Sequence, residues 1–304
     1  MRSVTQTTPA AFDVHAAIAN LFVYPVKSCA GVALQESVLT ETGLDLDRAW
    51  MVVDSNGEFV SQREIPRMAL IRPQLKTHEV VLRAPGMLAL HLQIDTVEKA
   101  TQARVWDDVV RAFDMGDLAA QWFSDFLAER RNGPAGHMQK YRLVRFDPEH
   151  QRLSSMQWTA GVAAPNQFSD GFPLLVTSTA SLDGLNRRLQ AQGHAAVGIE
   201  RFRPNIVLSG LEEHDEDRLN AIRITTGSGV AVLRPVKPCG RCTMPNIDPL
   251  TALSTPAVGD MLQSYRQDAR LDGAVTFGMN AIVIEGADLL LKIGQPVVGN
   301  FQFV

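Results

Sequence analysis

The sequence contains few cysteines and few lysines, and it has no long apolar run. Its three cysteines are Cys29, Cys239 and Cys242. An odd, low number of cysteines argues against a disulfide framework and is typical of a reducing compartment. No apolar run approaches the ~20 residues that a membrane-spanning helix requires. The first residues, MRSVTQTTPAAFDVHAA, lack the apolar core of a signal peptide. We therefore expect a cytoplasmic enzyme or binding protein that needs no membrane.

The chain also carries little excess charge. Its formal net charge is −4, which argues against nucleic-acid binding and against binding to anionic membranes. A 45% hydrophobic content is typical of a globular protein that buries a core without a disulfide or metal. Six of the 29 basic residues are lysine and the rest arginine. A codon bias explains most of that excess, so the positions of single arginines matter more than their number.

Short β-strands are the main elements that the sequence predicts. The turn Asp54-Ser55-Asn56-Gly57 separates two apolar segments and predicts a hairpin. Ser154–Gly171 has no periodicity and is expected to be a loop, either a linker or a segment that lines the site. Candidate strands are Asn20–Val26, Val32–Leu39, Ala49–Asp54, Glu79–Arg83, Leu88–Gln93, Ala103–Trp106, Tyr141–Phe146 and Pro173–Ser178, followed by the segments NIVLSG, IRITTG, VAVLRPV, FGMNAIVIEG and QPVVGNFQFV.

Two segments predict helices. In Asp117–Arg131 the apolar residues Leu118, Trp122 and Phe126 share one face, and Asp117 is a candidate cap. Thr179–Gly193 has Ser and Thr at its start and a glycine at its end. Many short strands with few helices favour closed or partly closed β-sheets with attached helices. The first strand is followed by no glycine-rich fingerprint, which argues against a dinucleotide-binding fold.

The segment Arg234–Pro249, RPVKPCGRCTMPNIDP, holds two of the cysteines in a C-x-x-C spacing. A structural zinc site needs four Cys or His ligands, and this pair has no second pair, so zinc is disfavoured. A thioredoxin-like couple remains open but is not favoured, because nearby prolines would break the helix that it requires. Plain packing suits Cys29 better than the pair, since Arg241 and Lys237 make the surroundings electropositive and favour a thiolate.

Cationic and hydroxyl side chains follow several predicted strands. They occur in Lys27-Ser28, at Arg48, in Thr177-Ser178 and in the segment Arg201–Asn205. Each one alone has a simple structural explanation as a solvated strand end or a helix cap. Together they would suit a large anionic ligand that takes several guanidinium, ammonium and hydroxyl donors. A thiolate would then complete a metal centre carried by that ligand.

Six segments in order resemble the MOSC-domain proteins with an N-terminal MOSC β-barrel domain, the branch that includes the mitochondrial amidoxime-reducing component and its bacterial relatives. The resemblance runs from about Leu21 to near the C-terminus and implies an α+β, mostly β fold. That fold would comprise a disordered tail (1–17), an N-terminal β-barrel-like domain with attached helices (18–150) and a MOSC-type β-barrel domain (151–304). The segments are LFVYPVKSCAGVAL, GLDLDRAWMVVD, SQREIPRMALIRP, FPLLVTSTASLDGLN, IERFRPNIVLSG and KPCGRCTMPNIDP.

The resemblance implies that the chain binds the molybdenum cofactor, a pterin dithiolene with a phosphate. Cys242 would be the protein ligand to molybdenum, and Cys239 a nearby structural thiol. Gly240 would contact the cofactor through its backbone only. The implied cofactor-binding residues are Lys27, Ser28, Arg48, Thr177, Ser178, Arg203, Asn205, Gly240, Arg241 and Cys242.

The resemblance also implies an activity, the two-electron reduction of small N-hydroxylated compounds such as amidoximes, hydroxylamines and N-hydroxylated bases. The cofactor would carry the difficult chemistry while the protein positions it. Some bacterial relatives have a cysteine-rich ferredoxin-type domain, which this sequence lacks. We therefore expect no fused iron–sulfur cluster, a separate ferredoxin-, flavodoxin- or reductase-like electron donor, and a monomer. The alternatives are a cofactor or sulfur carrier of the sulfurase type, and a thiol oxidoreductase that uses both Cys239 and Cys242.

Overall fold

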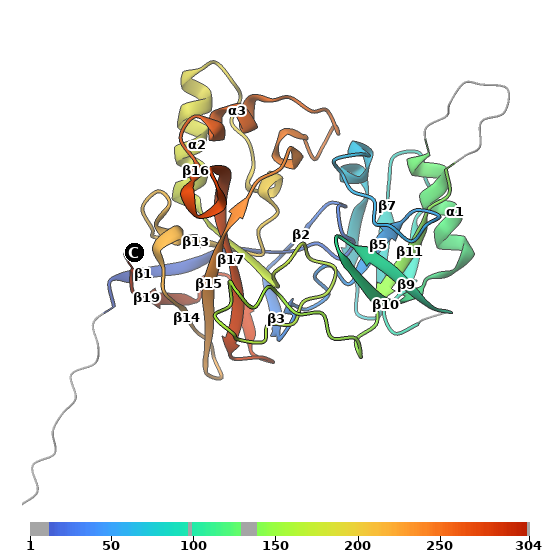
Figure 1. The fold of residues 1–304 in the computed structure, drawn as a ribbon, viewed down its shortest axis with the longest axis horizontal. Helices are drawn as coiled ribbons and strands as arrows, with labels where there is room; N and C mark the ends of the chain where they lie inside the picture. Colours follow the sequence, from blue (N-terminus) through green and yellow to red (C-terminus); the bar gives the residue numbers. More distant parts are fainter. Residues whose placement is uncertain (1–11, 97–98, 129–138, 303–304) are drawn as a thin grey trace, which may run out of the picture.

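Two lobes lie side by side in the computed structural model, which describes residues 12–96, 99–128 and 139–302 (Figure 1). The barrel lobe contains β1–β4, β12–β19 and the helices α2 and α3, and the N-terminal lobe contains β5–β11 and the helix α1. Within the described residues, no helix has the length and apolarity that crossing a membrane would require.

Seven strands of the barrel lobe close into a ring. The order is β12-β13-β1-β19-β14-β15-β17, and β17 pairs back with β12. All neighbours are antiparallel except β12 and β13. Closure removes the free strand edges of the sheet. The strands are β1 Val14–Val23, β12 Leu174–Ser178, β13 Ile206–Ser209, β14 Ile222–Thr225, β15 Val230–Gly240, β17 Ala274–Glu285 and β19 Pro296–Gly299.

Shorter elements surround this ring. β2 pairs with β1, β16 pairs with β17, and β3, β4 and β18 form a small sheet. The helix α2 packs on α3 and on β13. The bounds are β2 Val32–Leu34, β3 Glu36–Thr40, β4 Gly43–Leu44, β16 Gln267–Asp268, β18 Leu290–Lys292, α2 Thr179–Ala191 and α3 Ala257–Gln263, with 3-10 turns at Ile199–Phe202, Asp215–Arg218, Met244–Asn246 and Ala269–Leu271.

The N-terminal lobe packs two small sheets and one helix around its own core. One sheet has the order β5-β11-β10-β9 and the other β6-β7-β8. Trp50 of β5 and Phe123 and Phe126 of the helix α1 are fully buried in that core. The bounds are β5 Trp50–Val53, β6 Arg72–Leu75, β7 Glu79–Arg83, β8 Leu90–Gln93, β9 Lys99–Val105, β10 Asp108–Asp114, β11 Arg142–Phe146 and α1 Gly116–Leu127, with a 3-10 turn at Pro66–Leu70.

The mostly β class predicted from the sequence is confirmed, and so is the hairpin after β5. Val53 and Phe59 form an antiparallel bridge across the turn, in which Gly57 has a φ of 78°. The expected tail was too long, because residues 14–17 belong to β1, while residues 1–11 lie outside the described residues. The strand β1 also pairs with β13 and β19, so this strand belongs to the barrel lobe and not to the N-terminal lobe.

The helix α1 differs from the prediction in its N-cap and in the exposure of Leu118. It begins at Gly116, and the N-cap residue before it is Met115, whose side chain makes no capping hydrogen bond, so Asp117 is not the cap. Leu118 is 78% exposed, because the buried face is centred on Phe123 and Phe126 and turns Leu118 toward solvent. The expected end at Arg131 lies outside the described residues. The strands β4, β6, β10, β16 and β18 were not predicted.

Candidate functional site

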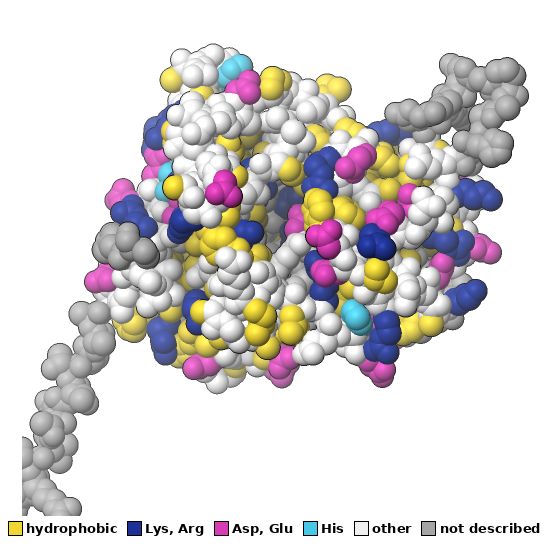
Figure 2. Space-filling view, viewed as in Figure 1, with side chains coloured by type: hydrophobic (Ala, Val, Ile, Leu, Met, Phe, Trp, Pro, Cys, Tyr) yellow, Lys and Arg dark blue, Asp and Glu magenta, His cyan; other side chains and the backbone are white. Residues whose placement is uncertain are grey.

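A cleft between the two lobes brings most of the predicted site residues together. Figure 2 shows the surface hollowed at this boundary. Cys242 follows β15 of the barrel lobe, while Phe59, Ser61 and Arg63 come from the N-terminal lobe. Eight of the ten predicted residues line the cleft, namely Lys27, Ser28, Arg48, Arg203, Asn205, Gly240, Arg241 and Cys242.

Three of these residues have a left-handed backbone conformation. The φ angles are 66° at Ser28, 51° at Arg48 and 59° at Arg203, and none of the three is a glycine. Each such residue costs on the order of 1–3 kcal/mol, and such residues cluster at functional sites. Backbone hydrogen bonds from Arg48 to the Tyr24 carbonyl and from Arg203 to the Glu200 carbonyl help to hold them. The fold therefore maintains strained turns where the cleft needs its polar side chains.

Arg48 and Arg203 are fixed against the ring of Tyr24. Their guanidinium carbons lie 4.3 and 4.2 Å from the ring centroid. Arg48 also donates to the buried carboxylate of Asp47, and Arg203 donates to the Cys29 carbonyl at 2.6 Å. Burial, and then the charge of Arg48, lower the pKa of Arg203 to about 10. Two like charges are thus held together, an arrangement that an anion in the cleft would relieve.

Lys27 lies in the same cleft and pairs with Asp170. Its Nζ donates to the Phe168 carbonyl at 2.7 Å and to the Asp170 carboxylate at 2.5 Å. Burial lowers the pKa of Lys27, and the charge of Asp170 opposes that shift. Burial would raise the pKa of Asp170, but the charge and hydrogen bond of Lys27 outweigh it and hold this pKa below its usual range. Lys27 and Asp170 therefore form an ion pair at the cleft, in which the Asp170 side chain is 66% exposed.

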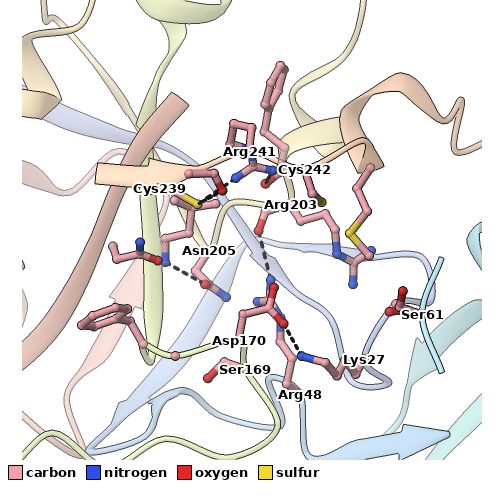
Figure 3. A pocket seen from close by; sticks show the side chains of 18 of the residues that line it. Lys27, Arg48, Ser61, Ser169, Asp170, Arg203, Asn205, Cys239, Arg241 and Cys242 are labelled. Atoms are coloured by element: carbon pink, nitrogen blue, oxygen red, sulfur yellow. Dashed lines mark hydrogen bonds and ion pairs between the residues drawn. The ribbon is translucent and has the colours of Figure 1, made fainter. Parts of the chain in front are cut away.

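The two cysteines of the C-x-x-C segment have different surroundings (Figure 3). Cys239 is partly buried, and Arg241 donates to its sulfur at 2.9 Å and to the Phe202 carbonyl at 2.9 Å. Cys242 is exposed in the cleft, and Arg63 Nη1 lies 3.9 Å from its sulfur. Among the described residues, no three His, Cys, Asp or Glu side chains gather into a group that could hold a metal ion. A metal at Cys242 would therefore need ligands from a bound group.

Unsatisfied donors show that the cleft fits a polar anionic ligand. Ser28 Oγ and Arg241 Nε are buried, and neither has a hydrogen-bond partner among the described residues. Buried polar groups are normally paired, so each such exception requires an explanation. At Gly240, an added Cβ would make only an ordinary contact with Leu271 at 3.7 Å. The protein itself does not require a glycine there, but a ligand that approaches the backbone closely would.

Asn205 lines the cleft and also joins two strands. Its side chain accepts from the Leu175 amide at 3.0 Å and donates to the Phe22 carbonyl at 3.3 Å. Both polar atoms are therefore engaged within the barrel. Asn205 positions β1 and β12 at the cleft, whatever contact it makes with a ligand.

Thr177 and Ser178 are the two predicted site residues that the cleft lining does not include. Both are fully buried. Ser178 caps α2, since its Oγ accepts from the Ser181 amide at 3.1 Å and donates to Glu216 at 2.8 Å. Here the local explanation, a helix cap, accounts for the hydroxyl of Ser178. Thr177 Oγ1 is buried without a partner among the described residues.

Several cleft residues were not predicted. Arg63 and Ser61 belong to the segment SQREIPRMALIRP, which carried the resemblance but was assigned no role. Asp170 belongs to the loop Ser154–Gly171, which was expected to be a linker or to line the site, but the residue itself was not singled out. The lining residues beyond the prediction are Phe59, Ser61, Arg63, Ser169, Asp170, Gly171, Phe172, Leu174, Leu175, Phe202, Cys239, Met244 and Asn280.

Two family models match consecutive parts of the chain. Residues 15–130 match the MOSC N-terminal beta barrel domain, and residues 163–298 match the MOSC domain. The chain thus combines an N-terminal MOSC β-barrel domain with a MOSC domain.

Curated relatives specify the branch. The chain is 36% identical over 293 residues to mitochondrial amidoxime-reducing component 1 of Mus musculus, which covers 92% of this chain and 81% of the relative. It is 33% identical over 294 residues to the Homo sapiens protein of the same name, with 92% and 82% coverage. It belongs to this family of MOSC-domain proteins with an N-terminal MOSC β-barrel. It is also 30% identical over 280 residues to the molybdenum cofactor sulfurase of Danio rerio, covering 86% of this chain but 31% of that protein.

Proposed function

We propose that the protein is a molybdenum-cofactor-dependent reductase of small N-hydroxylated compounds. The observation that carries the proposal is the exposed thiol of Cys242 in a cleft rich in cationic side chains and unsatisfied donors. The names of the mouse and human relatives support the reaction class. A thiolate is a soft ligand of the kind that suits such a metal, and a single protein ligand leaves room for a substrate.

The cofactor would be held from both sides of the cleft. Lys27, Arg48 and Arg203 offer ammonium and guanidinium donors that suit its phosphate and polar ring. Ser28 Oγ and Arg241 Nε would gain the hydrogen bonds that they lack within the protein. Cys242 would supply the sulfur ligand, and Gly240 the close backbone approach.

The reaction consumes two electrons and two protons. For a hydroxylamine, R–NH–OH + 2 e⁻ + 2 H⁺ gives R–NH₂ + H₂O, and the N–O bond is the one that breaks. When bound, the cofactor supplies the oxygen-accepting two-electron chemistry. The residues of the chain bind and orient the reactants between the lobes, where limited water strengthens each charge contact. The electrons would come from a separate redox protein.

The test begins with protein purified from a host that makes the cofactor. Molybdenum and pterin should be present at near one equivalent, and the loaded protein should reduce benzamidoxime with a chemical electron donor. Cys242→Ser should lose both metal and activity. Cys239→Ser is the matched control and should keep both, because its sulfur already accepts a hydrogen bond from Arg241 and is not the proposed metal ligand. Equal losses in the two variants would instead support a thiol couple.

A second candidate is a carrier of cofactor or sulfur without turnover. The similarity to the zebrafish sulfurase favours it, because that match spans most of this chain. The carrier predicts a fully loaded protein that fails to reduce benzamidoxime and 6-hydroxylaminopurine with a competent chemical donor. Reduction of either compound at a rate proportional to bound molybdenum would exclude it.

A further inference from the structure

Arg63 approaches the candidate metal ligand from the opposite lobe. Its Nη1 lies 3.9 Å from the sulfur of Cys242, a residue 179 positions away in the sequence. Arg63 belongs to the turn between Ser61 and the 3-10 turn at Pro66–Leu70. Its side chain is 20% exposed and lines the cleft. The N-terminal lobe thus places a cation directly beside the thiol that the barrel lobe presents.

An aromatic ring and a closed turn hold the Arg63 side chain in place. Its central carbon lies 4.8 Å from the centroid of the Trp106 ring. Trp106 is anchored in turn, since it packs on Phe59 at 5.0 Å and donates to Asp170 at 3.2 Å. The turn itself is closed by Glu64, which accepts from the amide and the hydroxyl of Ser61. Arg63 is therefore positioned by aromatic stacking and by its backbone.

Most of the donors of Arg63 remain unused, which distinguishes it from the other cations of the cleft. Lys27, Arg48, Arg203 and Arg241 each donate to an oxygen acceptor of the protein. Among the described residues, the side chain of Arg63 has no hydrogen bond to an oxygen. Its ion pair with Glu64 is long, at 3.7 Å from Nε to Oε1, and the other oxygen of that carboxylate accepts from Ser61. A guanidinium has five N–H donors, so several are available to a ligand.

We propose that Arg63 binds the oxygen of the N–O group of the substrate beside Cys242, an inference that rests on the proposed function. The oxygen of an amidoxime or hydroxylamine accepts a hydrogen bond from a guanidinium. Negative charge develops on this oxygen as the N–O bond breaks, and a fixed cation stabilises it. The atom and electron balance is that of the overall reaction, with electrons from the separate redox protein, and Arg63 is unchanged at the end.

The experiment measures binding without turnover. Loaded protein in the oxidised state, with no electron donor, is titrated with benzamidoxime by calorimetry. Arg63→Met should raise the dissociation constant about tenfold or more, because a charged hydrogen bond is lost. Arg63→Lys keeps the charge without the planar guanidinium, so its dissociation constant should lie between those of the wild type and Arg63→Met. Molybdenum content should stay at the wild-type level in both variants.

Arg67→Met is the matched control. Arg67 lies four residues along the same segment and also stacks on an aromatic ring, Phe126 at 4.6 Å, but it does not line the cleft. This control should bind benzamidoxime like the wild type. Unchanged binding in Arg63→Met overturns the inference while leaving the proposed function intact. Loss of molybdenum from Arg63→Met also overturns it, because Arg63 would then be a cofactor ligand. A fully loaded wild type that neither binds nor reduces benzamidoxime refutes the proposed function itself.

Discussion

The variant Ser178→Ala tests whether the hydroxyl of Ser178 stabilises the fold or binds the cofactor. In the folded protein, Ser178 Oγ accepts from the Ser181 amide at 3.1 Å and donates to buried Glu216 at 2.8 Å. Loss of an N-cap costs about 1 kcal/mol. Loss of the hydrogen bond to Glu216 costs about 1.5–3 kcal/mol above pH 7, where this carboxyl is charged. The two contacts share one atom and are not additive, so we expect the free energy of unfolding to fall by about 2–3 kcal/mol.

Urea denaturation of the cofactor-free protein measures this loss, and metal analysis of the loaded protein measures cofactor retention. Ser178→Ala should be destabilised but should retain molybdenum. Ser28→Ala provides the opposite case, since Ser28 Oγ has no partner among the described residues and faces the cleft. It should lose molybdenum while its stability changes by less than about 1 kcal/mol. Loss of molybdenum from Ser178→Ala at unchanged stability would refute the reasoning and restore Ser178 to the cofactor site.

Three further predictions concern the same region. Burial raises the pKa of Glu216 to about 7, so its contribution to stability is complete below pH 4.5 and is lost as the pH rises through 7. The stability of the wild type relative to Glu216→Gln should therefore fall by about 3 kcal/mol between pH 4 and 9 in urea titrations, and a constant difference would contradict this. Gly278→Ala should cost at least about 2 kcal/mol on thermal or urea unfolding, because φ is 77° and the new Cβ would lie 2.6 Å from Thr177 Cγ2. Arg203→Lys should lower the molybdenum-to-protein ratio measured by metal analysis, because an ammonium cannot both stack on Tyr24 and reach the Cys29 carbonyl; full loading would argue against this role.

Much of the site could be predicted because it lies at strand ends. Lys27, Arg48 and Arg203 each follow or precede an apolar strand-like segment, a local pattern that sequence reasoning detects. The resemblance then grouped them with Cys242. Arg63 and Asp170 lie in loops whose positions depend on how two lobes meet. No local periodicity records such long-range contacts, so these residues were missed.

The prediction of helices and strands was limited in the same way, because local patterns do not record long-range contacts. The helix cap at Ser178 was predicted because hydroxyl residues at a helix start have a local cause. The exposure of Leu118 was not predicted. Consecutive residues of a helix are 100° apart, and the surrounding core decides which face of the helix is buried. The place of β1 in the barrel was also missed, since its partner β19 lies at the other end of the sequence.

The pairing of β1 has a consequence for the order in which the molecule assembles. Its last residues pair with nearby β2, but its first residues, from Val14, pair only with β13 and β19. During synthesis this part of β1 must wait until residues 296–299 have emerged, and contacts so distant in sequence form slowly. Tyr24, Lys27 and Ser28 follow β1 directly, and the position of this turn relative to Cys242 depends on the same ring. The cleft therefore takes shape only once residues 296–299 have been made, and a cofactor would be loaded after that point.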